Sequence, residues 1–185
     1  MAIERLQTQR LILRPVEQRD ALLYFTRIAS RNAVSRSMLW SAHQDESETQ
    51  TAVRRMVSRY ADPGYCRWAI ALRSDDTIIG VAELLRFDPK KHSCSFAYMI
   101  GEDFWNQGYA TEALHAVFTH GFSVLGLENI EADHFADNPA SGRVMQKLGM
   151  THCGCIERKY EKDGVFHDAE CYRISKSDFF PFIRK

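Results

Sequence analysis

Three short runs of strand-forming residues follow one another in the middle of the chain, and they limit the possible folds more than any other feature. They cover residues 67–72, 77–87 and 94–100, and polar turns around Asp75 and Pro89 separate them. Connections this short join antiparallel neighbours, because parallel neighbours need a crossover of a dozen or more residues. The sequence therefore predicts an antiparallel three-stranded meander.

A helix and a further strand are predicted directly after the meander. Apolar residues recur at helical spacing over residues 108–125, and residues 129–135 alternate as a strand does. A helix that connects two strands of one sheet makes those strands parallel. The expected fold class is therefore α+β, with one parallel crossover inside a mostly antiparallel sheet.

The flanking segments add further elements. A first strand is predicted over residues 8–16, ended by Pro15, and Asp20 is expected to cap the helix that follows at residues 21–30. The other predicted elements are a helix over residues 48–60, a short helix over residues 141–148 that stops at Gly149, and tail strands near residues 151–160 and 168–174.

Length and composition exclude several classes of protein. The 185 residues favour a single domain covering residues 1–185, and 45% hydrophobic with 26% charged residues is typical of a soluble globular chain. The 24 basic and 24 acidic residues cancel, which argues against binding nucleic acid through a basic surface. No apolar run is long enough for a membrane span, and the first residues do not resemble a signal peptide. The five cysteines are an odd number, which argues against a framework of disulfide bonds. We therefore expect a cytoplasmic protein with reduced thiols.

The most informative segment, FWNQGYATEA at residues 104–113, lies between a predicted strand and a predicted helix. Gly108 and Ala110 keep the turn free of bulky side chains, so successive backbone N–H groups can approach a ligand. The following helix adds unpaired N–H groups and the positive end of its dipole, which suit a phosphate or a diphosphate. An ordinary turn at the start of a helix uses the same residue types, so this segment alone leaves both interpretations open.

A second segment of interest, DNPAS at residues 137–141, lies between a predicted strand and a short helix. Asn138 precedes a proline, which favours an extended backbone. Ser141 is a natural N-cap residue, and on local grounds capping is its simplest role.

Taken in order, these segments resemble the GNAT superfamily of acyl-CoA-dependent N-acyltransferases, and within it the branch of the ribosomal-protein N-terminal alanine acetyltransferases. The resemblance covers nearly the whole chain. The matching segments are TQRLILRP at residues 8–15, Ile79-Gly80, WNQGYATEA at residues 105–113, NPASGRVMQKLGM at residues 138–150, and the tail from Gly164 to Ile174. The resemblance implies about seven strands in a mixed, mostly antiparallel sheet with helices on both faces, and with the fourth and fifth strands splayed around the cofactor.

The resemblance also implies acetyl-CoA as the co-substrate and a primary amine as the acceptor. The composition argues against a nucleic-acid or membrane partner, and the Cys153-x-Cys155 spacing in the tail does not match a usual zinc site, so no metal is expected. The residues that it assigns are Met99 and Ile100 for the pantetheine arm, Gln107, Gly108, Tyr109, Ala110 and Thr111 for the diphosphate, Asn138 for the pantetheine amide, Ser141 for the departing thiolate, and Arg143 for the cofactor phosphates. The amine would attack the acetyl thioester directly, in a complex that holds both substrates.

Several positions depart from the family pattern. Asn106 replaces the usual glycine, Gln107 replaces a frequent cation, and Cys94-Ser95 stand where many relatives have a catalytic carboxylate. The general base is therefore open. Glu83 is our candidate, acting directly or through water, although an outward-facing carboxylate on a half-exposed strand explains this residue equally well.

The acceptor predicted from this resemblance is the N-terminal α-amino group of a protein. An amine with a pKa near 8 needs less help to lose its proton than a lysine-like amine near 10, which suits a site without an obvious base. The segment over residues 35–48 is expected to line the acceptor pocket, and its acidic residues Asp45, Glu46 and Glu48 favour a cationic acceptor.

Two alternative functions stay open on the sequence. One is acetylation of a small-molecule amine, such as an amino acid, a polyamine or an antibiotic. The other is a sensor that binds acyl-CoA without catalysis. Both a monomer and a homodimer are compatible with the sequence.

Overall fold

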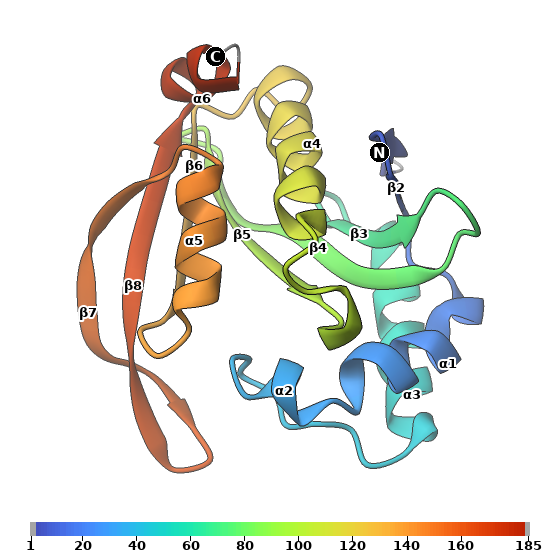
Figure 1. Cartoon of the computed structure of the whole chain (residues 1–185). Helices are drawn as coiled ribbons and strands as arrows, with labels where there is room; N and C mark the ends of the chain where they lie inside the picture. The colour runs from blue at the N-terminus through green and yellow to red at the C-terminus, as the bar shows by residue number, and fades with distance from the viewer. Residues whose placement is uncertain (1–2, 184–185) are drawn as a thin grey trace.

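An eight-stranded sheet organises the chain, in the order β1-β2-β3-β4-β5-β6-β8-β7 (Figure 1). The structure, a computed structural model, describes residues 3–183 and the side chains of residues 3–180. The strands are β1 (Leu6–Gln7), β2 (Leu11–Arg14), β3 (Cys66–Leu72), β4 (Ile78–Asp88), β5 (Ser93–Ile100), β6 (Asn129–Phe135), β7 (Thr151–Lys162) and β8 (Val165–Ser175).

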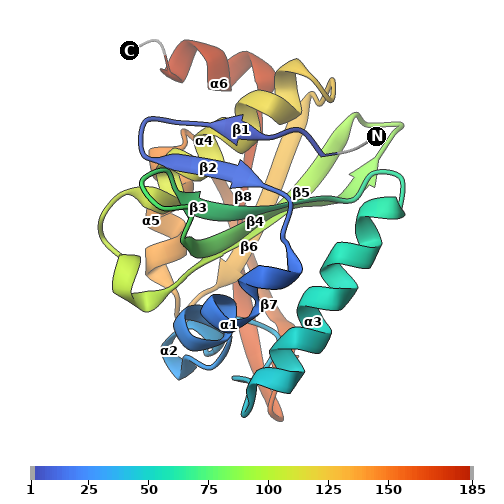
Figure 2. The ribbon, with the colours of Figure 1, turned by 90° about the vertical axis from the view of Figure 1, so that its right-hand side faces the viewer.

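Helices cover both faces of this sheet (Figure 2). On one face lie α1 (Ala21–Tyr24), α2 (Asn32–Ser35) and α3 (Glu46–Ser58), and on the other lie α4 (Tyr109–Ser123) and α5 (Pro139–Lys147), with α6 (Lys176–Ile183) after β8. Short helical turns complete the chain: η1 (Gln18–Asp20), η3 (Arg59–Ala61) and η4 (Glu102–Phe104) are 3-10 helices, and η2 (Phe25–Ala29) is a π-helix. Within residues 3–183, no helix combines the length and the apolar character that crossing a membrane requires.

The predicted meander and crossover are both confirmed. β3, β4 and β5 are antiparallel neighbours, and β6 runs parallel to β5 after the α4 crossover. The eighth strand is the two-residue β1, which was not predicted. Thr8 ends it with a turn, because Thr8 N donates to the Leu11 carbonyl (3.0 Å) and Leu11 N donates to Thr8 Oγ1 (2.9 Å). The first predicted strand is therefore shorter, and only Leu11–Arg14 forms β2.

Asp20 does not cap α1, contrary to the expectation from the sequence. Its side chain makes no capping hydrogen bond to α1, and its two oxygens accept hydrogen bonds from the Arg14 guanidinium, each at 2.8 Å. Glu17 N also donates to Asp20 Oδ2 at 2.8 Å. The Arg14 side chain is only 3% exposed, and a buried guanidinium needs a paired carboxylate to offset its lost hydration. The Asp20 carboxylate is therefore used by the ion pair with Arg14 and does not cap α1.

β5 and β6 pair only where they begin. Their parallel register joins Ser93, Cys94 and Ser95 to residues 129–131, and it ends there. β6 continues beside β8 as far as Phe135, whereas β5 continues beside β4 as far as Ile100. The two strands therefore diverge, as the family resemblance implies.

β7 and β8 form a long hairpin that reaches past the sheet toward α2 (Figure 1). At its tip, Lys162 Nζ donates to the carbonyl oxygens of Ser35 and Trp40. Ser41 Oγ also donates to the Asp163 carboxylate at 3.4 Å. These hydrogen bonds attach the hairpin tip to the end of α2 and to the loop that follows it.

Candidate active site

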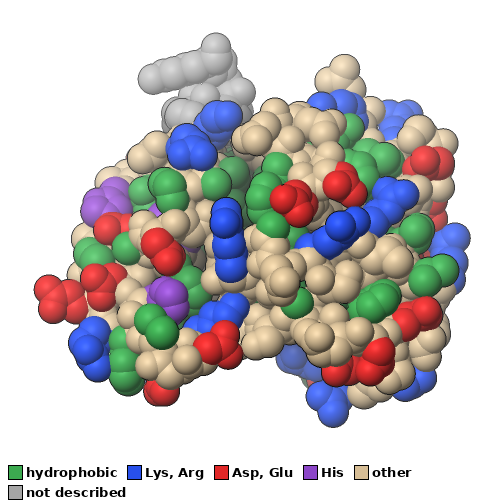
Figure 3. Space-filling view, turned by 60° about the horizontal axis from the view of Figure 1, so that its bottom comes forward, with side chains coloured by type: hydrophobic (Ala, Val, Ile, Leu, Met, Phe, Trp, Pro, Cys, Tyr) green, Lys and Arg blue, Asp and Glu red, His purple; other side chains and the backbone are tan. Residues whose placement is uncertain are grey.

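A cavity of about 410 Å³ opens where β5 and β6 separate. Its lining comes from residues 33–38 in and after α2, 98–100 at the end of β5, several positions between 104 and 111 around the start of α4, and several between 138 and 147 in and before α5. Figure 3 shows the underside of the view in Figure 1, where the surface is hollowed between two lobes and basic side chains lie along the hollow. The divergence of two strands thus brings helices from both faces of the sheet to one site.

Most of the site residues predicted from the sequence line this cavity. They are Met99, Ile100, Gly108, Tyr109, Ala110, Thr111, Asn138, Ser141 and Arg143. Gln107 and Glu83 are not among the lining residues. The Gln107 side chain turns back to donate to the Asp103 carbonyl (3.0 Å). The Glu83 carboxylate forms an ion pair with Arg67, because the two residues lie directly opposite each other on β4 and β3.

The loop before α4 leaves backbone N–H groups without partners beside the cavity. Asn106 and Gly108 have φ angles of +59° and +82°, and α4 begins at Tyr109. Among the described residues, no acceptor is bonded to the N–H groups of Tyr109, Ala110 or Thr111. Such groups at the positive end of a helix dipole bind anions. Asparagine tolerates a left-handed backbone better than most residues, which explains how Asn106 can stand where the family usually has glycine.

The end of β5 is held by the indole of Trp105. Trp105 Nε1 donates to the Ile100 carbonyl at 2.7 Å, and the N–H of Gly101 donates to the Ile79 carbonyl at 2.8 Å. The family resemblance assigns the Ile100 backbone to the pantetheine arm. The Trp105 indole occupies one of the two lone pairs of the Ile100 carbonyl oxygen. A second lone pair on the Ile100 carbonyl oxygen stays available to a ligand.

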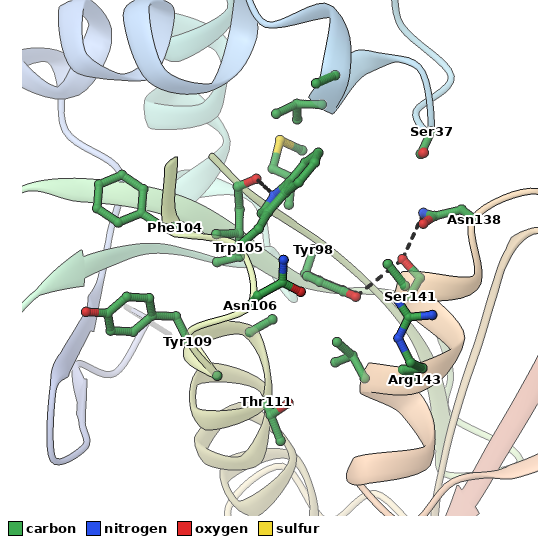
Figure 4. Close-up of a pocket in the computed structure, with 18 of the residues that line it drawn as sticks. Ser37, Tyr98, Phe104, Trp105, Asn106, Tyr109, Thr111, Asn138, Ser141 and Arg143 are labelled. Atoms are coloured by element: carbon green, nitrogen blue, oxygen red, sulfur yellow. Dashed lines mark hydrogen bonds between the residues drawn. The ribbon is translucent and has the colours of Figure 1, made fainter. Parts of the chain in front are cut away.

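Ser141 receives two hydrogen bonds at the wall of the cavity (Figure 4). Asn138 Nδ2 donates to its Oγ at 3.0 Å, and the Tyr98 hydroxyl donates to the same atom at 3.3 Å. Burial raises the pKa of Tyr98, and the hydrogen bond to Ser141 only partly offsets this, so the phenol stays protonated. Because both neighbours donate, the hydroxyl hydrogen of Ser141 is free to donate to a ligand.

The structure also excludes the simplest role considered for Ser141. The N-cap of α5 is Asn138, with Pro139 at the first helical position, so Ser141 lies inside the first turn. Gly142 allows α5 to approach the sheet closely, since a Cβ atom there would lie 2.8 Å from His134 Nε2. This close packing fixes the position of the neighbouring Ser141.

Tyr98 is a site residue that was not predicted from the sequence. The alternation of side chains along a strand could have indicated it, since Tyr98 and the predicted site residue Ile100 lie two positions apart on β5 and share one face of the sheet. The hydroxyl contact with Ser141 joins residues 43 positions apart, however, and no local pattern predicts such a contact.

We expect Tyr98→Phe to lower kcat about fivefold to tenfold and to leave the Kd of CoA nearly unchanged. The phenylalanine ring fills the same space, but Ser141 loses one of the two donors that orient its hydroxyl. Steady-state kinetics and calorimetry of each variant would measure the two quantities. An equal loss of CoA affinity would contradict this role, because it would show that Tyr98 contributes to binding instead.

Within the part of the chain that the structure describes, the charged side chains that line the cavity are all basic: Arg36, Arg143 and Lys147. The acidic residues expected to favour a cationic acceptor lie elsewhere. Asp45 caps α3 by accepting from Ser47 N and Glu48 N, and neither Glu46 nor Glu48 belongs to the lining. The electrostatic environment of the cavity therefore does not favour a cationic acceptor.

The sequence profile of the acetyltransferase (GNAT) domain matches residues 10–151. These residues include both diverging strands, the loop before α4 and the whole of α5. The chain belongs to the GNAT acetyltransferase family. It is therefore an acyltransferase enzyme, and the family and fold predicted from the sequence are confirmed.

Relatives of this GNAT enzyme align along most of its length. The uncharacterized N-acetyltransferase YoaA of Bacillus subtilis (strain 168) is 29% identical over 171 residues, which are 92% of this chain and 96% of the relative. The ribosomal protein uS5-alanine N-acetyltransferase of Escherichia coli (strain K12) is 28% identical over 185 residues, covering 96% of this chain and 93% of that one. The solved structure of the microcin C7 self-immunity acetyltransferase MccE, in complex with acetyl-CoA and AMP, shares the fold, with a TM-score of 0.80 at 18% identity over 91% of this chain and 93% of that one.

Proposed function

We propose that this GNAT enzyme transfers the acetyl group of acetyl-CoA to the N-terminal α-amino group of a protein. The observation that carries the proposal is the cavity between β5 and β6, with unpartnered N–H groups on one wall and the Ser141 hydroxyl on another. The name of the Escherichia coli relative, a ribosomal protein uS5-alanine N-acetyltransferase, supports this acceptor class.

The residues at the start of α4 and in α5 fit the diphosphate end of acetyl-CoA. The N–H groups of Tyr109, Ala110 and Thr111 supply donors without a basic side chain, and Arg143 and Lys147 add positive charge along the same cavity. The complex of MccE with acetyl-CoA and AMP supports the same ligand for this fold.

In the proposed reaction, the amine nitrogen bonds to the acetyl carbon while the carbon–sulfur bond breaks. The proton that the nitrogen loses ends on the released thiolate, so the products are the amide and the free thiol of CoA. Ser141 would donate a hydrogen bond to the departing sulfur, because Tyr98 and Asn138 already donate to its oxygen. A serine hydroxyl is a weak acid, so it stabilises the developing negative charge and does not need to transfer its proton.

The choice of an α-amino acceptor follows from the side chains around the cavity. No carboxylate or imidazole lines it among the residues that the structure describes, so the amine must arrive already neutral. At about pH 7.5, roughly a third of α-amino groups but only about 0.1% of lysine-like amines are neutral. The positive charge of Arg36, which lines the same cavity and is not assigned to the diphosphate, lowers the pKa of a nearby ammonium further.

The test compares two peptides of the same sequence, one with a free N-terminal alanine and no lysine, the other with a blocked N-terminus and one lysine. We expect thiol release from acetyl-CoA with the first peptide, and kcat/KM that rises with pH through the amine pKa near 8. A preference for the lysine peptide would contradict the α-amino proposal. Thiol release with neither peptide, despite tight CoA binding, would favour the sensor.

A small-molecule amine is the second candidate acceptor, and the β7–β8 hairpin is the observation that favours it. Lys162 and Asp163 attach the tip to residues 35–41, and this segment contributes Ser37 and Met38 to the cavity, so the tip lies next to one wall of the cavity. Free alanine and a polyamine belong in the same assay. Faster turnover with either of them than with the alanine peptide would favour this second candidate.

A further inference from the structure

The turn between β1 and β2 packs against the loop that precedes α4. Thr8 Oγ1 donates to Glu112 Oε1 at 2.6 Å, and Arg10 N donates to the same oxygen at 2.8 Å. Arg10 Nε donates to Glu112 Oε2 at 2.7 Å. The carboxylate in the first turn of α4 therefore receives donors from a segment about a hundred positions earlier in the sequence.

The Arg10 guanidinium, which is bonded to Glu112, also contacts the loop that precedes α4. Its Nη1 donates to the Gln107 carbonyl at 3.0 Å, and its Cζ lies 4.4 Å from the centroid of the Tyr109 ring. A Cβ atom on Gly108 would lie 3.4 Å from Arg10 Nη2. One planar side chain thus contacts Gln107 and Tyr109 and lies beside Gly108, directly before and at the start of the segment whose N–H groups face an anion in the proposed function.

Charge explains why this contact matters for an anion. A carboxylate at the first turn stabilises a helix, but the charge of Glu112 would repel a diphosphate bound beside it. Burial opposes the ionised form of Glu112, and the hydrogen bonds from Thr8 and Arg10 outweigh burial, so the pKa of Glu112 is lowered. The carboxylate stays ionised and its charge is neutralised by Arg10.

We propose that Arg10 is a positioning residue, which holds residues 107–109 in the conformation that binds the diphosphate and neutralises Glu112 beside it. This inference rests on the proposed use of acetyl-CoA. Arg10 is not among the residues that line the cavity, so it acts through the loop and not by touching the ligand.

The test compares Arg10→Ala, Arg10→Lys and a matched control, Arg73→Ala. The Arg73 guanidinium donates to the Thr8 carbonyl in the same turn (3.4 Å) and not to the loop. For Arg10→Ala we expect the Kd of CoA to rise about tenfold. Arg10→Lys should raise the Kd by a similar factor, because a lysine ammonium cannot bond to both Glu112 and Gln107 and also stack on the Tyr109 ring. Arg73→Ala is expected to stay within about twofold of the wild type.

A truncated substrate separates positioning from general damage to the fold. S-acetylpantetheine has no diphosphate, so its rate of use is expected to change less than about twofold in Arg10→Ala. Equal losses with acetyl-CoA and S-acetylpantetheine would overturn the inference, as would full CoA affinity in Arg10→Lys. Wild-type protein that does not bind CoA would instead contradict the proposed function, which keeps the two failures distinct.

A double variant tests the path through Glu112. If Arg10 acts on the loop together with this carboxylate, Arg10→Ala and Glu112→Gln combined should raise the Kd of CoA no further than Arg10→Ala alone. Fully additive losses would show that the two residues act independently and would overturn the neutralisation part of the inference.

Discussion

Replacing Gly108 with valine is expected to weaken CoA binding at least about a hundredfold, measured by calorimetry. Gly108 has a φ angle of +82°, which a β-branched residue adopts only at a large cost, so the loop would leave this conformation. A Cβ atom there would also face the Arg10 guanidinium, which lies behind the loop. The N–H groups of Tyr109, Ala110 and Thr111 would then no longer converge on one anion.

Gly64→Val is the matched control for this experiment. Gly64 has a φ angle of +79°, a Cβ atom there would meet only open space, and the residue lies outside the cavity lining. Valine there imposes a similar backbone strain, so both variants should lose similar thermal stability while Gly64→Val keeps wild-type CoA affinity. Wild-type affinity in Gly108→Val would contradict the assignment of the loop.

Ser141→Ala is expected to lower kcat about a hundredfold while the Kd of CoA changes less than about threefold. The hydroxyl is oriented by Tyr98 and Asn138, and its hydrogen bond to the departing sulfur strengthens only as negative charge develops. Turnover measured with the alanine peptide and calorimetry with CoA would separate the two effects.

Two comparisons make this prediction sharper. Ser58→Ala removes a hydroxyl that donates to the Arg55 carbonyl at the exposed end of α3, and its kcat should equal that of the wild type. Tyr98→Phe combined with Ser141→Ala should be no slower than Ser141→Ala alone, because Tyr98 acts through Ser141. An unchanged kcat in Ser141→Ala would leave this serine with a structural role only.

Much of the fold could be predicted because its signals are local. The strands over residues 67–100 and the helix that starts near Gly108 are recognisable from side-chain periodicity and turn residues, and the structure places them within a few residues of the predicted bounds. The same is true of the loop before α4, where small residues mark the required backbone conformation. Missed elements such as β1 and α6 are short or lie at the end of the chain.

The features that local sequence patterns do not reveal depend on partners from other elements. Asp20 is a good cap by residue type, but a buried Arg14 takes its carboxylate. Glu83 lies outside the cavity because the register of β3 and β4 places Arg67 opposite it. The role of Tyr98 is not visible in the sequence, because its hydroxyl contacts Ser141 only once α5 is packed on the sheet.

The order and type of most elements, the family, and the backbone loop proposed to bind a diphosphate are readable from the amino-acid sequence, because these features follow from neighbours along the chain. The side chains that meet at the cavity, and the side chain that supports the loop, become known only when the elements are packed together. Arg10 and Gln107 are 97 positions apart, yet they are joined by a 3.0 Å hydrogen bond. Contacts of this kind depend on the register and packing of the whole sheet, which no local pattern of residues encodes.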